Sequence, residues 1–191
     1  RLATDIGDKT AAQVHTHLLL TTIKRARSTG LPVIVAIDDD SDHRFTERLL
    51  NTGVDVETQG QGDLGQRLKH ATRAPGRHTV LGSDCVCFDP AWLVEAAHAN
   101  VPVVIGPAID GGYWSITIDN TIVNLREIAF DCMPWSQPTL FQHTVSRLKS
   151  QSINHRLLPQ SYDIDTLSDL ERLLADEHCP PQLKRDLQAL L

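Results

Sequence analysis

The chain has 191 residues, of which 41% are hydrophobic and 22% are charged, and its formal net charge is −6. These values are ordinary for a folded domain with a sizeable core, so we treat residues 1–191 as a single domain. The acidic balance argues against broad binding to nucleic acid or to an anionic membrane, while a local basic pocket for a phosphate stays open. No apolar run approaches the ~20 residues that a membrane-spanning helix needs, and no signal peptide is visible.

Helical spacing of apolar residues, together with capping and stop residues, predicts a series of helices. In chain order they cover about 9–28, 43–51, 64–73, 90–99, part of 120–130, 138–149, 166–174 and 181–191. The first ends at Gly30 and Pro32, and the helix at 166–174 opens with a capping box formed by Thr166 and Asp169.

Short apolar runs between these helices predict strands, which cover 33–37, 54–58, 79–83, 101–106, 113–118 and 155–158. Their alternation with helices predicts an α/β fold, with three α/β/α layers around a mostly parallel sheet. The chain opens in a loop that runs into a helix. The strand that usually opens a βα fold therefore lies upstream of Arg1 or is lacking. We expect the strands at 33–37 and 79–83 to flank the position that it would fill.

Two aspartates that follow predicted strands are the main functional candidates. Asp84 and Asp110 each come directly after an apolar run, at a turn that contains glycine. In open α/β sheets, ligands bind beyond the carboxyl ends of the strands. Glycines such as Gly111 and Gly112 let the backbone approach a ligand closely. The pair therefore predicts a metal and phosphate site, and we expect both carboxylates to open into one pocket.

Two other groups of potential metal ligands are weaker candidates. The run Asp38-Asp39-Asp40 could hold a metal, but such a run is more often a solvated loop that caps the next helix, and we favour that interpretation. The cysteines lack the two CxxC-like pairs of a zinc site, and we expect reduced thiols in a cytoplasmic protein. We assign none of the nine histidines to a metal.

Six segments in order resemble the motifs of one bacterial family. They are Arg1-Leu2 with Gly7, Gln61–Arg67, Gly82–Cys85, Gly106–Ala108 with Asp110–Tyr113, Trp135-Ser136 with Thr144, and Asp163–Thr166 with Asp169-Leu170. The family is an uncharacterised, glycosyltransferase-like group, labelled "transferase 1" and associated with radical-SAM and selenodomain proteins. It belongs to the nucleotide-diphospho-sugar transferase (GT-A) superfamily. The resemblance spans nearly the whole chain and implies a GT-A fold.

The chain departs from this family at three places. The family's first strand, with its glycine- and lysine-containing loop, is absent before Arg1. Val86 and Cys87 stand where the family usually has proline and aspartate, which removes a carboxylate near the expected metal. Gln137 stands where the family usually has threonine.

The resemblance implies transfer from a nucleotide-activated donor. Such a reaction needs charge neutralisation at the leaving diphosphate, usually by Mg²⁺ or Mn²⁺ held by one or two carboxylates. Asp84 is the candidate metal ligand, and its alternative role is that of a turn or capping aspartate. Asp110 is the candidate residue that holds or deprotonates the acceptor hydroxyl, and Gly111-Gly112 would lie against the substrate. The alternative is a simple turn between two strands.

Each of the remaining candidate binding residues also has an alternative role that is purely structural. Arg1 and Lys9 would contact phosphates, or they belong to a solvated terminus. The loop with Gly62, Asp63 and Gly65, followed by Arg67, would cover the nucleotide base or ribose; alternatively, Asp63 caps a helix and pairs with Arg67. Trp135 would wall the acceptor pocket, or it packs in the core. We expect Asp163 and Asp165 to cap the last helices.

These observations favour a metal-dependent enzyme that transfers a glycosyl group from a nucleotide sugar to an acceptor that the sequence does not identify. Nucleotidyl transfer is a close variant, because the same fold serves both reactions. A degenerate, non-catalytic nucleotide-binding or scaffold domain is the alternative from another class. The sequence does not indicate an oligomeric state.

Overall fold

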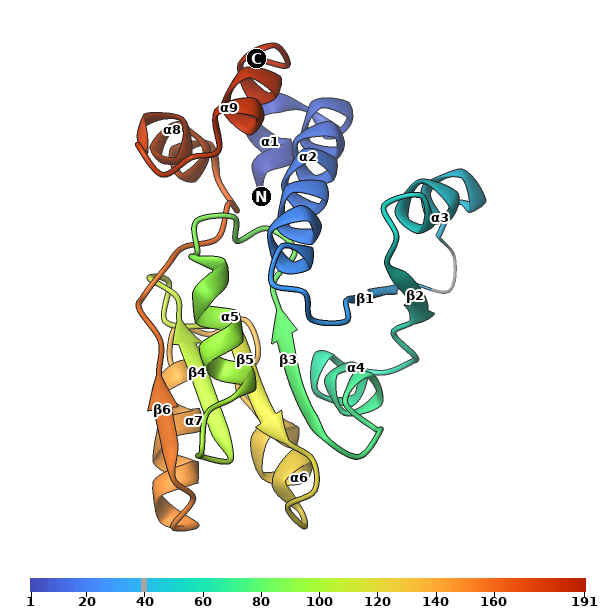
Figure 1. Cartoon of the computed structure of the whole chain (residues 1–191). Helices are drawn as coiled ribbons and strands as arrows, with labels where there is room; N and C mark the ends of the chain where they lie inside the picture. The colour runs from blue at the N-terminus through green and yellow to red at the C-terminus, as the bar shows by residue number, and fades with distance from the viewer. Residues whose placement is uncertain (39–40) are drawn as a thin grey trace.

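The structure is a computed structural model that describes residues 1–38 and 41–191, so the predicted loop residues Asp39 and Asp40 lie outside the described part (Figure 1). Its helices are α1 (Leu2–Ile6), α2 (Asp8–Arg27), α3 (His43–Leu50), α4 (Leu64–Ala71), α5 (Pro90–Ala97), α6 (Leu125–Phe130), α7 (Leu140–Ser150), α8 (Leu167–Ala175) and α9 (Pro181–Gln188). Its strands are β1 (Ile34–Ile37), β2 (Asp55–Thr58), β3 (Arg77–Leu81), β4 (Val103–Pro107), β5 (Tyr113–Asp119) and β6 (His155–Leu157).

Each predicted helix and strand corresponds to one in the structure, although the first and last residues differ. The first residues were expected to form a loop, but Leu2–Ile6 is the short helix α1, and Leu2 is buried among the residues of α2 and α8. Asp42 caps α3 by accepting a hydrogen bond from the backbone of Arg44. The capping box of Thr166 and Asp169 at α8 is confirmed.

The strands form two sheets rather than one. β1 and β2 pair in parallel, and a four-stranded sheet has the order β3-β5-β4-β6. In the second sheet, β5 runs antiparallel to both β3 and β4, while β6 runs parallel to β4. The prediction of a mostly parallel sheet is therefore wrong for this part. The reason is the short loop between β4 and β5, since a parallel connection needs a crossover of a dozen or more residues.

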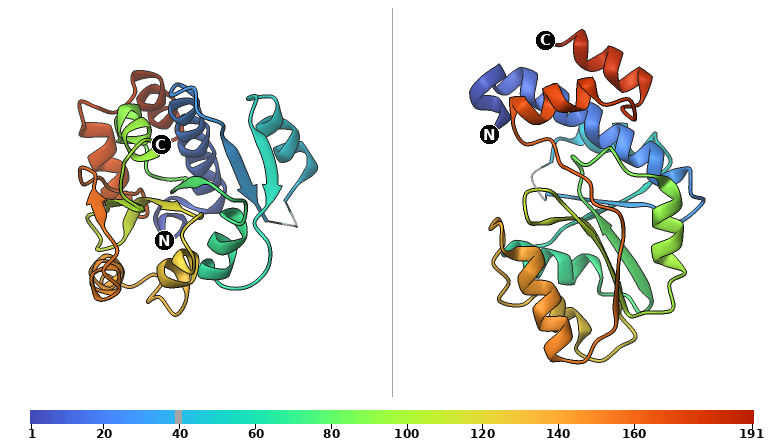
Figure 2. Two further views of the ribbon diagram at one scale, coloured as in Figure 1. Left: turned by 60° about the horizontal axis from the view of Figure 1, so that its bottom comes forward. Right: turned by 90° about the vertical axis from the view of Figure 1, so that its left-hand side faces the viewer.

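Helices cover both faces of the four-stranded sheet (Figure 2). On one face, Phe88, Leu93 of α5 and Ala26 of α2 pack against Trp114 of β5. On the other, α6 and α7 pack against the buried isoleucines of β4 and β5. The strands β4 and β5 are almost fully buried, as their apolar sequences predict.

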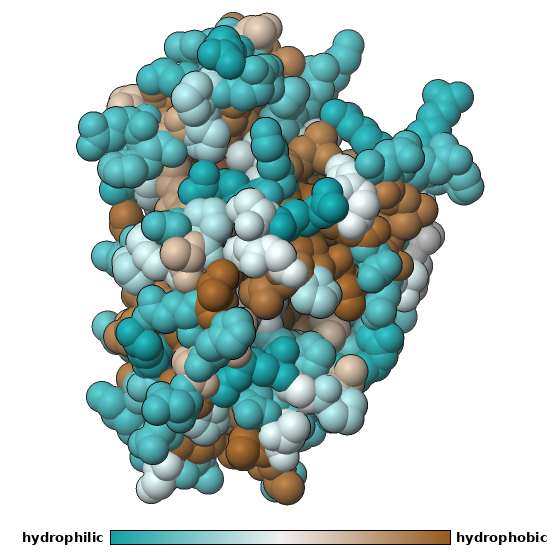
Figure 3. Space-filling model, viewed as in Figure 1, coloured by the Kyte–Doolittle hydropathy of each residue, from teal (hydrophilic) through white to brown (hydrophobic). Residues whose placement is uncertain are grey.

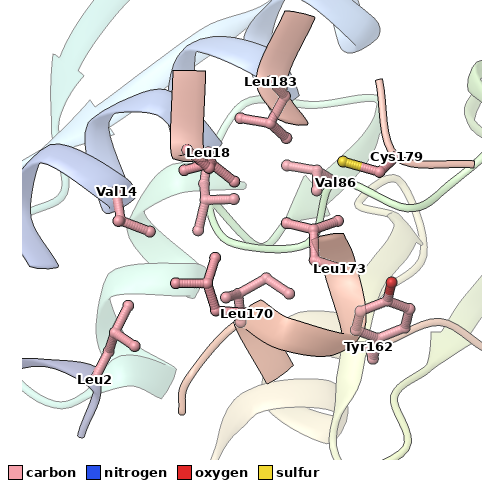
Figure 4. Close-up of a cluster of buried hydrophobic side chains, with 11 residues drawn as sticks. Leu2, Val14, Leu18, Val86, Tyr162, Leu170, Leu173, Cys179 and Leu183 are labelled. Atoms are coloured by element: carbon pink, nitrogen blue, oxygen red, sulfur yellow. The ribbon is translucent and has the colours of Figure 1, made fainter. Parts of the chain in front are cut away.

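A separate helical cluster closes one end of the molecule. Helices α1, α2, α8 and α9 surround a buried group to which Val14, Leu18, Leu170 and Leu183 belong (Figure 4). Val86, from the segment after β3, also packs into this cluster. The cluster therefore anchors the turn that carries Asp84.

The strands β1 and β3 line one cavity of about 720 Å³, together with residues of α2. Backbone pairing in the described part joins β1 only to β2, and β3 only to β5. Both strands therefore border one cavity, as the prediction requires, and a strand missing from this position stays a prediction. Apolar surface is visible in the hollow between α2, β3 and the β1–β2 pair (Figure 3).

Phe88 offers a test of the core. Its ring is 1% exposed, stacks on Trp114 with ring centroids 5.4 Å apart, and lies beneath the guanidinium of Arg25. We expect Phe88→Ala to lower the free energy of unfolding by about 3–5 kcal/mol in urea titrations, because it leaves a cavity under both partners. The control Val123→Ala alters a side chain that is 82% exposed and should change stability by less than ~0.5 kcal/mol. Equal effects of the two substitutions would contradict the packing.

Candidate functional site

The carboxyl ends of β3, β4 and β6 meet at one edge of the sheet. Because β5 is antiparallel to both β3 and β4, these two strands point the same way, and β6 follows β4. Asp84 comes shortly after β3, Asp110 shortly after β4, and Asp163 and Asp165 follow β6. The fold thus gathers four carboxylates, which we call the carboxylate cluster.

Ser161 ties the three strand ends together. Its hydroxyl donates a hydrogen bond of 2.6 Å to the carbonyl of Cys87 and accepts one from the Cys85 thiol at 3.4 Å. Its backbone N–H donates to the carbonyl of Pro107, and its carbonyl accepts from the N–H of Ile109. Ser161 is only 3% exposed, so these contacts fix the segments that carry the carboxylates.

Asp84 lies in the turn that this network holds. Burial raises the pKa of its carboxyl, and the charges of Asp165 and Asp110 raise it further, whereas a hydrogen bond from its own backbone and His15 lower it. The neighbouring Ser83 hydroxyl lies 3.2 Å from Nε2 of His15 in α2. The position of Asp84 is therefore that of a partly buried anion among other anions, with one histidine nearby.

Asp110 is exposed, and its Oδ1 accepts a hydrogen bond of 2.9 Å from the N–H of Gly112. This geometry is the turn-forming role that an aspartate can play without any ligand. Gly111 has φ 90°, and a Cβ there would lie 2.0 Å from the carbonyl oxygen of Pro138. The packing of this loop against the start of α7 therefore explains Gly111 without a substrate.

Asp163 and Asp165 belong to the cluster, which the sequence reasoning missed. They were expected to cap helices, but Thr166 and Asp169 make that cap. Burial, followed by the charges of Asp110 and Asp84, raises the pKa of Asp163 to about 6. The sequence contains a signal for this arrangement, because the apolar residues Tyr162 and Ile164 alternate with the two aspartates. Both apolar residues are buried in the structure, so the alternation turns the carboxylates away from the core.

Arg1 reaches the cluster through an ion pair of 3.0 Å with Asp165. Both side chains are well exposed, so the pair is weak in water and its partners can exchange. Lys9 lies in the first turn of α2 with an exposed side chain. The structure thus brings one of the two predicted phosphate-binding cations to the carboxylates.

The loop before α4 is organised by its own packing. The Asp63 side chain caps α4 through the backbone of Gln66, and Nε of Arg67 donates to the carbonyl of Gly62 at 3.0 Å. The ion pair between Asp63 and Arg67, which was the alternative to a role in binding, is absent from the ion pairs of the described part. A Cβ on Gly65 would lie 2.4 Å from the carbonyl oxygen of Phe130, so close packing requires this glycine.

Trp135 packs against the same loop and against β5. Its ring meets Tyr113 edge-on with centroids 6.4 Å apart, and its Nε1 lies 3.0 Å from the Cβ position of Gly65. The packing role considered for Trp135 is therefore confirmed, and a role in an acceptor pocket stays a prediction.

The large cavity beside β1 and β3 reaches the cluster only at its margin. His15 and Ser83 line it, but Asp84 and Asp110 do not. The expectation that both aspartates open into one pocket is not met by this cavity.

Among residues 1–38 and 41–191, no group of three His, Cys, Asp or Glu side chains is placed to hold a metal by itself. No helix of that same part is long and apolar enough to cross a bilayer.

The comparisons with known proteins agree with this architecture. The model of the DUF2064 family, described as "uncharacterized protein conserved in bacteria", matches residues 21–137, more than half of the sequence. The chain belongs to this family. Among curated proteins, none matches significantly.

A solved structure described as a "putative nucleotide-diphospho-sugar transferase" from Desulfovibrio desulfuricans G20 is similar over 100% of this chain and 88% of its own, with a TM-score of 0.83. At 23% sequence identity, this likeness shows that the DUF2064 chain shares the α/β fold of that protein.

Gly111 can be tested against a matched glycine. We expect Gly111→Ala to destabilise the protein by about 1–3 kcal/mol more than Gly30→Ala. Both positions have positive φ, but a Cβ at Gly30 meets nothing within 4 Å, so the control isolates the clash with Pro138. Urea unfolding of both variants measures the difference. Equal losses would show that the loop yields to the methyl group.

The raised pKa of Asp163 predicts a pH dependence of stability. The folded state holds this proton more tightly than the unfolded state, so stability from this group is present below the ordinary pKa and is lost as the pH rises through about 6. Between about pH 4 and pH 7, the wild type should therefore lose stability relative to Asp163→Asn in urea titrations without divalent ions. A pH-independent difference between the two proteins would contradict the assignment.

Proposed function

We propose that this chain is a metal-dependent transferase that takes a nucleotide-activated donor and transfers a glycosyl group from a nucleotide sugar. The observation that supports the proposal most directly is the carboxylate cluster at the carboxyl ends of β3, β4 and β6. Ligands of open α/β sheets bind at this edge. The fold of the similar putative nucleotide-diphospho-sugar transferase adds support at the level of architecture.

The residues of the cluster suit a hard divalent cation. Asp84 offers oxygen ligands, which Mg²⁺ and Mn²⁺ prefer, and the carboxylate of Asp163 lies near enough to interact with it electrostatically. Burial and mutual repulsion raise the pKa values of Asp84 and Asp163, so a cation would relieve an unfavourable arrangement of like charges. The incomplete protein cage matches an ion that takes one or two carboxylates and completes its shell with phosphate and water.

In this proposal the ion, when bound, neutralises negative charge on the leaving diphosphate. Asp84 holds the ion, because it is the partly buried carboxylate beside β3. Asp110, oriented by the N–H of Gly112, binds the acceptor hydroxyl and receives its proton. Arg1 exchanges its partner Asp165 for a phosphate oxygen, and Lys9, in the first turn of α2, adds a second cation.

The other residues predicted to contact the substrate give the proposal weaker support. The packing of Gly65 and Gly111 is explained without a ligand. We keep the loop of Gly62 and Asp63, with Arg67, as the proposed cover of the base or ribose, and Trp135 as the proposed wall of the acceptor site.

Product analysis separates glycosyl from nucleotidyl transfer. The protein is incubated with Mn²⁺ and a panel of nucleotide sugars, and separately with nucleoside triphosphates and sugar phosphates. Free nucleoside diphosphate indicates glycosyl transfer, and pyrophosphate indicates nucleotidyl transfer. Binding of nucleotide without any turnover would favour the non-catalytic alternative.

Metal binding by Asp84 has a direct test. We expect Mn²⁺ together with a nucleoside diphosphate to raise the melting temperature of the wild type but not of Asp84→Asn. A ligand at 100 times its Kd adds ~2.7 kcal/mol, so the loss is easy to detect. Asp55→Asn is the control, because this exposed aspartate lies on β2, away from the cluster. Equal stabilisation of Asp84→Asn and the wild type would remove Asp84 from the metal site.

A further inference from the structure

His15 is a side chain beside the carboxylate cluster that the proposed function does not use. It lies in the first half of α2 and is exposed, and its Nε2 is 3.2 Å from the hydroxyl of Ser83. Ser83 directly precedes Asp84 in the turn after β3. The imidazole is therefore held next to the turn that carries the candidate metal ligand.

Helix α2 passes this turn and holds it at a second point (Figure 1). The hydroxyl of Thr22 donates to the carbonyls of Ser83 and Cys85, each at 3.4 Å, and Thr22 is only 5% exposed. His15 and Thr22 are seven residues apart, so they lie on the same face of the helix, about two turns from each other. The position of the imidazole is therefore set by a helix that is anchored to the turn, rather than by a surface loop.

The contact with Ser83 leaves one ring nitrogen of His15 available. Within residues 1–38 and 41–191, the hydrogen bond to Ser83 is the only one that this ring makes. In a neutral imidazole, the hydrogen bond made by one nitrogen decides whether the other carries the proton. When the Ser83 hydroxyl donates to Nε2, the proton lies on Nδ1, which then offers a free N–H group.

The charges around His15 indicate which ligand this N–H group could meet. Burial raises the pKa of the Asp84 carboxyl, and His15 is among the groups that lower it, so the ring and the carboxylate lie within electrostatic range. With a divalent ion at Asp84, a bound diphosphate would still have oxygen atoms that need N–H groups. Arg1 pairs with Asp165, a different carboxylate of the cluster. His15 is therefore placed to supply an N–H group on the Asp84 side.

We propose that His15 binds the diphosphate of the nucleotide-activated donor through Nδ1, while the Ser83 hydroxyl orients the ring by donating to Nε2. This inference rests on the proposed function, because it needs the diphosphate to lie at the ion held by Asp84. It adds a residue to the site that contacts the leaving group directly. Loss of His15 should therefore weaken the binding of diphosphate and leave the binding of the metal alone unchanged.

The test measures binding of pyrophosphate to the whole chain by calorimetry, with Mn²⁺ present. His15→Gln places an amide near the position of Nε2, so it can keep the contact with Ser83, but it has no group at the position of Nδ1. We expect this variant to bind pyrophosphate at least ~10-fold more weakly than the wild type, because hydrogen bonds to charged groups are among the stronger ones. His15→Asn, whose amide lies near the position of Nδ1, should keep more of the affinity.

His17→Gln is the matched control. His17 lies two residues further along α2, so it faces another way, and its Nδ1 is 3.7 Å from Asp186 of α9. The same substitution there should leave the affinity for pyrophosphate unchanged. NMR of the wild type with ¹⁵N-labelled histidine gives a second measurement. Mg²⁺ with pyrophosphate should shift the Nδ1 resonance of His15 and slow the exchange of its proton, whereas Mg²⁺ alone should not.

Three results would overturn the proposal, and each has a different meaning. Equal affinities of His15→Gln and the wild type for pyrophosphate would remove His15 from the site and leave the proposed function standing. A parallel loss of affinity for Mn²⁺ alone in His15→Gln would mean that His15 only supports the turn that carries Asp84. If the wild type binds no pyrophosphate in the presence of Mn²⁺, the diphosphate site is wrong, and the proposed function fails with it.

Discussion

The buried hydroxyl of Ser161 is the contact on which the arrangement of the carboxylate cluster depends. It joins the segment after β3 to the segment after β6, while its backbone continues the pairing with the end of β4. Strand direction explains why such a junction can exist, because β5 makes β3 and β4 parallel and brings their ends to one edge. A single small side chain thereby sets the spacing of groups that lie about 80 residues apart in the sequence.

The carboxylate cluster lowers the stability of the folded state. Like charges that are held together and partly withdrawn from water raise the pKa values of Asp84 and Asp163, which disfavours the folded state at neutral pH. The helical cluster of α1, α2, α8 and α9 and the buried strands β4 and β5 supply the opposing stability. In the proposed function, a rigid scaffold that keeps the carboxylates close would favour a cation, because a bound ion would relieve their repulsion.

Much of the fold could be predicted from the sequence, and the errors have physical causes. Apolar periodicity located the helices and strands, but it contains no information on strand direction, and the hairpin signal of the loop around Gly111 was not used. Asp84 and Asp110 were found because each follows an apolar run. Asp163 was missed because β6 is short and weakly patterned, so the carboxyl end of this strand was not recognised as part of the same edge.

The four cysteines differ in chemical accessibility, and this difference makes the protein convenient to label. Burial raises the pKa of Cys85 to about 12 and that of Cys87 to about 11, and it also raises the pKa of Cys179. Little reactive thiolate therefore forms at these positions near neutral pH. Cys132 is exposed, at a turn just after α6. A maleimide fluorophore should consequently attach at Cys132 in the folded chain, and unfolding would expose the other three sulfurs.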